Sequence, residues 1–344
     1  MIDTGHSAAC FGWNFAAQQL MLRLLTNDLQ EREVKNDMTK QSPDMSARAW
    51  IELGLLSVLW GGTFFSIAIA LREVGPFTAV LHRVGWAALL LWLVVWARGL
   101  PFPGGWKLWA AFLVMGCLNN VIPFSLMTWG QTRIESGLVS IFNAMTAPLG
   151  VLVAALLLRD EPLSARRLSG VALAFLGACV VIGIDRLGSL DPRALGQWAV
   201  LGGTLSYAFA GVWGKLQLRG IAPEVAAAGM LTGSTLVMIP MVLWTEGIPS
   251  IALSAPVWGA IAYYAIFATA GAYLLYYRVL GMAGAGNLLL CTLLIPPIAI
   301  FLGWAFLNEH LGAEAFMGFG LIGLGLALID GRLVRRAFKR QISS

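Results

Sequence analysis

Stretches of about twenty consecutive apolar residues, separated by short polar turns, follow one another along most of this sequence. A bilayer core about 30 Å thick is crossed by an α-helix of about 20 apolar residues. Gly and Pro in the intervening turns are typical of helix ends. We therefore predict ten transmembrane helices, at Trp50–Leu71, Phe77–Ala97, Trp106–Gly130, Gly137–Leu158, Ala165–Ile184, Leu195–Gly214, Val225–Trp244, Val257–Tyr277, Ala285–Leu307 and Ala313–Ile329.

The composition favours a polytopic membrane protein over a soluble one. Of the 344 residues, 58% are hydrophobic and 12% are charged, and the mean hydropathy is +0.76. Soluble globular domains carry about 25% charged residues, roughly twice that share. The 14 Trp residues agree with this reading because Trp favours the bilayer interface. We predict an all-α integral membrane fold.

The charges and cysteines exclude several other classes of protein. The net charge of +5 comes from Lys and Arg in loops, and no basic groove interleaved with aromatic residues is present. A nucleic-acid partner is therefore not expected. Cys117, Cys179 and Cys291 lie inside apolar runs, and the chain has no CxxC pair. We interpret them as small buried apolar residues and expect neither a metal nor a cofactor.

The distribution of Lys and Arg predicts the orientation of the chain. With a cytoplasmic N-terminus, the inner loops and the C-terminal tail carry 15 of these residues and the outer loops carry 4. Cytoplasmic loops normally hold the excess, so both termini are predicted to be cytoplasmic. We expect 1–49 to be a disordered tail and 332–344 a basic tail. The alternatives for the first segment are a surface helix over Ala16–Leu29 or a start at Met38 or Met45.

One part of the sequence returns at a constant offset of 148 residues. Five helices per copy is an odd number, so the second copy begins on the opposite side of the membrane. We therefore predict two inverted five-helix repeats, 50–184 and 195–331, an arrangement typical of secondary transporters. The alternative is chance similarity between apolar helices. The matching pairs are Pro148 and Pro296, Glu161 and Glu309, Leu163 and Leu311, Gly170 and Gly318, and Gly177 and Gly325.

Two of these pairs predict local structure in both repeats. Glu161 and Glu309 each precede a predicted helix, and we expect each to cap it because a carboxylate favours the positive end of the helix dipole. Pro148 and Pro296 lie inside predicted helices, where Pro removes a backbone hydrogen bond. We expect both helices to be interrupted there and to supply the moving gates.

The order and spacing of several motifs resemble the EamA-like transporters of the drug/metabolite transporter superfamily. The resemblance covers about residues 50–330. It implies two inverted five-helix repeats in a bacterial inner membrane, and export or exchange of small metabolites, often amino acids or their derivatives. His82 departs from the family pattern, which usually has an apolar residue there. The motifs are Leu59–Phe64, Arg83, Pro148, Leu156–Leu163, Thr269–Tyr277, Pro296, Gly303, Trp304, Glu309 and Gly318.

Polar and aromatic side chains inside the apolar segments are the candidates for a substrate site. A transporter needs a polar-lined cavity near the membrane midplane. Ser125 and Tyr273 match at the offset of 148 residues, and we expect them to face each other. The alternative is that these groups only hydrogen-bond helices together. The candidates are His82, Arg83, Trp60, Asn119, Asn120, Ser125, Trp129, Asn143, Tyr207, Thr269, Tyr273, Tyr276 and Asn287.

The neighbouring pair His82 and Arg83 is the strongest of these candidates. A guanidinium group suits a substrate carboxylate or phosphate because its nitrogens form a planar fork. His82 is the group in the apolar segments whose ordinary pKa lies near 7, which suits proton coupling. The alternative is that Arg83 extends to the outer interface or bonds backbone carbonyls.

The sequence therefore predicts a secondary transporter that works by alternating access. No P-loop, HExxH or GxSxG pattern and no carboxylate pair at membrane depth is present, so we expect no ATP hydrolysis and no enzyme activity. The expected partners are a small-molecule substrate and membrane lipids, with the chain a monomer or homodimer. The alternative is a flippase for a lipid-linked substrate, or a membrane subunit without transport activity.

Overall fold

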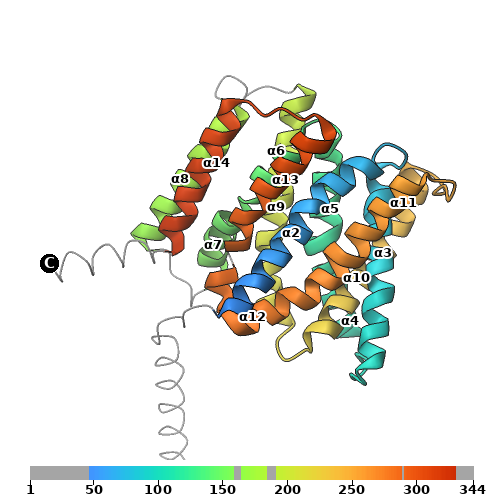
Figure 1. Cartoon of the computed structure of the whole chain (residues 1–344). Coiled ribbons are helices and arrows are strands. Elements are labelled where there is room, and N and C mark those ends of the chain that lie inside the picture. Colours follow the sequence, from blue (N-terminus) through green and yellow to red (C-terminus); the bar gives the residue numbers. More distant parts are fainter. Residues whose placement is uncertain (1–45, 159–163, 184–190, 289, 331–344) are drawn as a thin grey trace, which may run out of the picture. The chain divides into compact units, whose positions relative to one another are not determined.

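The structure is a computed structural model that describes residues 46–158, 164–183, 191–288 and 290–330, all in helices and turns. Within these ranges, nine helices are long and apolar enough to cross a membrane (Figure 1). The 26-residue helix α9, Pro192–Gln217, is not among them, although the sequence predicts a span there. Gln197, Thr204, Ser206 and several glycines within the helix lower its apolar content. The predicted tails lie almost wholly outside the described residues.

The helices follow the predicted apolar segments closely. The first group comprises α2 (Ala47–Ala70), α3 (Pro76–Ala97), α4 (Trp106–Gly116), η1 (Cys117–Val121), α5 (Ile122–Gln131), α6 (Ser136–Asn143), α7 (Thr146–Leu157) and α8 (Ala165–Ile182). The second group comprises α9 (Pro192–Gln217), α10 (Pro223–Thr245), α11 (Ala255–Ala262), η3 (Tyr263–Gly271), α12 (Ala272–Leu288), α13 (Leu290–Leu307) and α14 (Ala313–Asp330).

Local capping signals explain where several helices begin. The Ser46 side chain accepts a hydrogen bond from the Ala49 backbone N–H at the start of α2, at 3.2 Å. The Asp191 carboxylate accepts one from Ala194 at the start of α9, at 2.8 Å. Such caps satisfy backbone donors that have no partner inside the helix. Pro also occupies a first-turn position in α3, α9 and α10, where its missing N–H costs nothing.

Two predicted spans contain π-helical segments. The third span is built from α4, η1 and α5, and the eighth from α11, η3 and α12. Hydrogen bonds in a π-helix run from i to i+5, so the side chains before and after such a segment are rotated relative to an α-helix. The rotation decides which residues share a face.

The helix interruptions lie at different places from those predicted. The fourth span divides into α6 and α7 at Ala144, so that Pro148 falls in the first turn of α7. A missing N–H has no cost in a first turn, because no intrahelical acceptor is available there. Helix α13, by contrast, continues through Pro296 and Pro297. The predicted break at Pro296 is therefore wrong; the positive φ of 74° at Gly284 lies in the predicted connector between the eighth and ninth spans.

Two glutamates bind the N-termini of helices that are distant in sequence. Glu309 accepts hydrogen bonds from the Ser136 backbone N–H at 2.9 Å, the Ser136 hydroxyl at 2.8 Å and the Gly137 N–H at 3.2 Å. Glu246 likewise binds the first N–H groups of α3, at 2.9 and 2.8 Å. The prediction that Glu309 caps the following helix is wrong, because its carboxylate lies at the positive end of α6 instead. Glu161 lies outside the described residues.

Helices far apart in sequence pack side by side. Close pairs include α8 with α14, α3 with α10, α2 with α13, and α9 with both α5 and α7 (Figure 1). Trp92 on α3 donates a hydrogen bond from Nε1 to Thr232 Oγ1 on α10, at 2.8 Å. The helix α3 therefore lies between α10 on one side and η3 on another.

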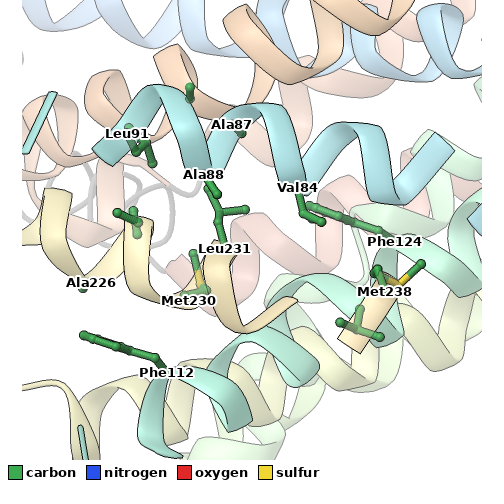
Figure 2. Packing of buried hydrophobic residues seen from close by; sticks show 14 of the residues in the cluster. Val84, Ala87, Ala88, Leu91, Phe112, Phe124, Ala226, Met230, Leu231 and Met238 are labelled. Atoms are coloured by element: carbon green, nitrogen blue, oxygen red, sulfur yellow. The ribbon is translucent and has the colours of Figure 1, made fainter. Parts of the chain in front are cut away.

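A buried apolar cluster holds α3, α4 and α10 together. Figure 2 shows Ala88 and Leu91 of α3 facing Leu231 of α10, with Phe112 of α4 on the far side of α10. Leu91 and Leu231 are fully buried. Burial of these apolar side chains fixes the position of α3, and with it the position of the polar residues on its other faces.

Candidate functional site

Arg83 contacts side chains from two other parts of the fold. Its Nε atom donates a hydrogen bond to Thr269 Oγ1 on η3, at 2.9 Å. Its guanidinium carbon lies 3.8 Å from the centre of the Phe124 ring on α5, which is a cation–π contact. The next residue, Val84, is fully buried in the α3–α10 cluster and anchors this turn of the helix. Arg83 is thus held between α5 of the third span and η3 of the eighth span.

The π-helical segment η3 orients the hydroxyl that Arg83 binds. Thr269 donates its own proton to the backbone carbonyl of Tyr264, five residues earlier, at 2.7 Å. The hydroxyl oxygen is therefore an acceptor toward Arg83. Segments of π-helix occur frequently at functional sites because they change the direction of side chains locally.

Three tyrosines, Tyr207, Tyr264 and Tyr273, lie in the region of Arg83 and interact with its charge. The Tyr207 ring packs edge-on against Phe124, with centroids 6.4 Å apart. Tyr264 is fully buried, and within the described ranges its hydroxyl has no hydrogen-bond partner. Tyr264 belongs to a buried apolar cluster with Ile67 and Ile261, so its hydroxyl is an unpartnered polar group inside the fold.

Sequence reasoning missed Tyr264 and Phe124. On an α-helix, Thr269 shares a face with Tyr273 and Tyr276 but not with Tyr264, so α-helical periodicity does not select Tyr264 as a candidate. The Thr269 hydroxyl bonds the Tyr264 backbone carbonyl five residues earlier, within the π-helical segment η3. Phe124 is apolar and carries no sequence signal that distinguishes it from core residues. Neither residue could be found from periodicity alone.

The positive charge of Arg83 is not balanced by a carboxylate among the described residues. The ion pairs that these residues form involve other arginines, namely Arg48, Arg98, Arg193 and Arg278. A buried charge is costly unless it is paired, and hydroxyls and an aromatic face compensate it only in part. The site is therefore electropositive.

A chain of hydrogen bonds adjoins the Arg83 contacts. Asn119 Nδ2 donates to the Tyr273 hydroxyl at 3.1 Å, and this hydroxyl donates to Asn120 Oδ1 at 3.1 Å. Asn120 Nδ2 in turn donates to Ser234 Oγ on α10, at 2.9 Å. The structure thus joins η1, α12 and α10 through three of the predicted residues, together with Ser234, which was not predicted.

His82 lies against a different set of neighbours from Arg83. Trp86 Nε1 donates a hydrogen bond to His82 Nδ1 at 3.2 Å, so the neutral imidazole carries its proton on Nε2. The Trp258 ring packs edge-on against the imidazole at 5.7 Å. Within the described part of the chain, His82 Nε2 is buried without a hydrogen-bond partner. Successive residues of a helix point in different directions, which separates His82 from the Arg83 contacts.

The remaining aromatic candidates on α2 and α12 form a separate group. The Trp60 and Tyr276 rings lie 5.9 Å apart, and Tyr276 packs edge-on against Tyr277 at 5.2 Å. Ser125 is buried and donates to Met238 Sδ on α10, at 3.9 Å. Ser125 therefore lies against α10, while its expected counterpart Tyr273 bonds the two asparagines.

Three further candidates lie apart from the Arg83 contacts. Trp129, in the last turn of α5, has its ring 3.5 Å below the Arg133 guanidinium. Asn143 is the half-buried last residue of α6. Asn287 is buried and donates to the Ala283 carbonyl at 2.8 Å. These contacts are local and connect none of the three to the hydrogen-bond chain around Tyr273.

Other features of the described residues do not add to this site. No three His, Cys, Asp or Glu side chains among them gather in a way that would hold a metal ion. A cleft of about 150 Å³ opens between α6, α13 and α14. Its lining includes Glu309 and none of the predicted candidates. The lining residues are Gly137, Ile300, Trp304, Glu309, His310, Leu311 and Phe316.

Comparison with known proteins relates the chain to membrane transporters. The model of the EamA-like transporter family matches it twice, over residues 48–183 and 194–330. The chain is 22% identical to the uncharacterized transporter YoaV of Bacillus subtilis, over 83% of this chain and 98% of that protein. It is 26% identical to the protein PecM of Dickeya dadantii, over 79% and 89% of the two chains.

Two further comparisons concern location and fold. The uncharacterized inner membrane transporter YedA of Escherichia coli is 24% identical, over 80% of this chain and 88% of that protein. One solved crystal structure superposes with a TM-score of 0.62 at 17% sequence identity, covering 85% of this chain and 99% of the other. This likeness extends over nearly the whole of the solved chain.

Proposed function

Because this chain belongs to the EamA-like transporter family, we propose that it is a secondary transporter that exports or exchanges small metabolites by alternating access. The proposed location is a bacterial inner membrane, with both termini in the cytoplasm. The observation that carries the proposal is the Arg83 site, which joins α3 to α5 and η3. Transporter substrates bind where two repeats meet, near the membrane midplane.

Contacts between helix ends support a topology of ten alternating spans. Arg98, after α3, pairs with Glu224 in the first turn of α10, and both lie on the side predicted to be cytoplasmic. Glu135 and Arg193 form a two-fold hydrogen-bonded pair at 3.1 Å, and both belong to the side predicted to be external. In each case, the contact joins two helix ends that ten alternating spans would place on the same side of the membrane. This is the pattern expected of ten spans that include α9.

The packing of α8 against α14 supports inverted repeats. Gly170 approaches Gly325, and Gly177 approaches Gly318. Gly170 matches Gly318 in the duplicated sequence, and Gly177 matches Gly325. The first glycine of one copy, Gly170, therefore lies against the second glycine of the other copy, Gly325. This crossed pairing requires the two helices to run antiparallel. Two copies in the same orientation would pair like with like.

Solute counterflow in proteoliposomes tests the function. The purified full-length chain is expected to exchange one or more labelled members of a panel of amino acids and their derivatives. Arg83→Gln should lower that exchange by about tenfold or more, because a hydrogen bond to a charged partner is worth about 1.5–3 kcal/mol. Arg133→Gln is the matched control, since Arg133 is exposed and packs on Trp129.

The outcomes separate the transporter from the alternative drawn from the sequence. Exchange that is equal in Arg83→Gln and in the native chain would remove Arg83 from the substrate site. Scrambling of labelled lipid without exchange of any solute would instead support a flippase for a lipid-linked substrate. Melting temperatures of both Arg variants in detergent that equal that of the native chain would show that each variant is folded.

A further inference from the structure

We propose that the ligand of the Arg83 site is an amphipathic monocarboxylate that carries no free ammonium group. This inference rests on the proposed transport function and narrows its substrate class. It excludes zwitterionic amino acids as preferred ligands and favours aryl- or alkyl-carboxylates and N-acylated amino acids. Three features of the site lead to it: the free edge of the guanidinium, the charge balance, and the aromatic surroundings.

The guanidinium of Arg83 is fixed on one edge and one face. Its Nε is bound to Thr269, and its Cζ lies over the Phe124 ring, 3.8 Å from the ring centre. Within the described ranges, no protein group accepts a hydrogen bond from either Nη atom of Arg83. The two Nη atoms are the donors with which arginine binds a carboxylate through parallel hydrogen bonds. The protein thus orients the guanidinium and leaves both of its Nη donors available to the carboxylate of a ligand.

The charge balance favours an anion over a zwitterion. A monocarboxylate cancels the charge of Arg83, whereas a zwitterion brings an ammonium group into a site that is already positive. Such a group would need a carboxylate of its own. Seven described carboxylates are already bound to other groups; they are Glu52, Glu73, Glu135, Asp191, Glu224, Glu246 and Glu309.

The remaining neighbours suit an apolar body. Phe124 and Tyr207 present rings that pack edge to face, a surface that binds flat or branched apolar groups. The Tyr273 hydroxyl is already used by Asn119 and Asn120.

The test compares ligands that share one scaffold and differ in charge. They are 3-phenylpropionate, N-acetylphenylalanine, phenylalanine and phenethylamine. Binding to the full-length chain in nanodiscs is measured by thermal shift, and exchange by counterflow in proteoliposomes. The two anions are expected to bind at least about tenfold more tightly than phenylalanine, with no binding of phenethylamine. Arg83→Lys should weaken anion binding about tenfold because a point charge replaces the fork; Arg133→Lys should not.

Each outcome bears on one proposal or on both. Phenylalanine bound and exchanged as well as 3-phenylpropionate would overturn the monocarboxylate inference and leave the transport function standing. Anion binding without exchange of any solute would support the inference and count against transport. Anion binding unchanged in Arg83→Lys, or no binding by any of the four ligands, would overturn the inference. The melting temperature of ligand-free Arg83→Lys shows whether that variant is folded.

Discussion

Gly170 of α8 lies so close to Gly325 of α14 that a Cβ atom on Gly170 would stand 2.6 Å from the Gly325 carbonyl oxygen. A Cβ on Gly325 would stand 2.5 Å from the Gly170 carbonyl oxygen. Real Cβ contacts are almost never shorter than 3.0 Å, and the atoms met are backbone, so the helices would have to separate. Small residues allow membrane helices to approach in this way.

Substituting Gly325 should therefore destabilise the packing of α8 against α14. We expect Gly325→Val to lower the free energy of unfolding by about 1–3 kcal/mol, because an overfilled contact forces backbone shifts. Gly320→Val is the control on the same helix, since nothing lies within 4 Å of a Cβ at Gly320. Thermal unfolding in detergent measures both. Equal melting temperatures would show that the close approach is not needed for stability.

Removing the Tyr273 hydroxyl should weaken the chain of hydrogen bonds at the site. Tyr273→Phe leaves Asn119 with only the weak acceptor Met230 Sδ and leaves Asn120 Oδ1 without its donor. A buried polar group without a partner costs about 1–3 kcal/mol, so the melting temperature should fall. Tyr277→Phe, whose ring packs edge-on against Tyr276, should change it little. A Tyr273→Phe protein as stable as the native one would mean that water replaces the hydroxyl.

Neutralising Glu309 should loosen the start of α6. The carboxylate accepts three hydrogen bonds there, two of them from backbone N–H groups at the positive end of the helix. Glu309→Gln should cost about 1–2 kcal/mol, since bonds to an ionised acceptor are about twice as strong as neutral ones. Faster amide hydrogen exchange at Ser136 and Gly137 in Glu309→Gln would report the loosening of the start of α6. Glu314→Gln, an exposed acid in the first turn of α14, should leave those amides unchanged.

The loop between α2 and α3 should make stability depend on acidic pH. Hydrogen bonds from the Ser254 side chain and backbone N–H hold the pKa of the exposed Glu73 carboxyl below its usual value of 4.5. A lowered pKa means that the stabilising effect is full above pH 4.5 and is lost as the pH falls through the folded-state pKa. The melting temperatures of the native chain and Glu73→Gln should therefore differ at neutral pH and converge in acid. A gap that persists in acid would contradict this assignment.

Much of the fold follows from local features of the sequence. The apolar runs place the helices because each run must satisfy its backbone groups internally within a bilayer. The caps at Ser46 and Asp191 lie where capping residues precede such runs. The resemblance to the EamA-like family is confirmed by matches over both halves of the chain. These signals act over a few residues, so a sequence displays them directly.

The helix interruptions were less predictable than the helices. Pro148 and Pro296 look equivalent in the sequence, yet α7 begins beside the first while α13 passes through the second. Neighbouring helices can satisfy the carbonyl that an interior Pro leaves free, and that depends on packing. The partner of Glu309 was missed for the same reason, because Ser136 lies 173 residues away in sequence.

The sequence by itself determined that this is a helical membrane protein with a duplicated pattern and that Arg83 is an unusual charge within an apolar segment. Hydrophobicity, charge and repetition are properties of residue order, and no folding is needed to read them. Only the tertiary structure decided what surrounds Arg83. Thr269, oriented by the π-helical segment η3, and the Phe124 ring of α5 converge on it from separate helices. Such convergence depends on packing between helices, which residue order specifies only through the whole fold.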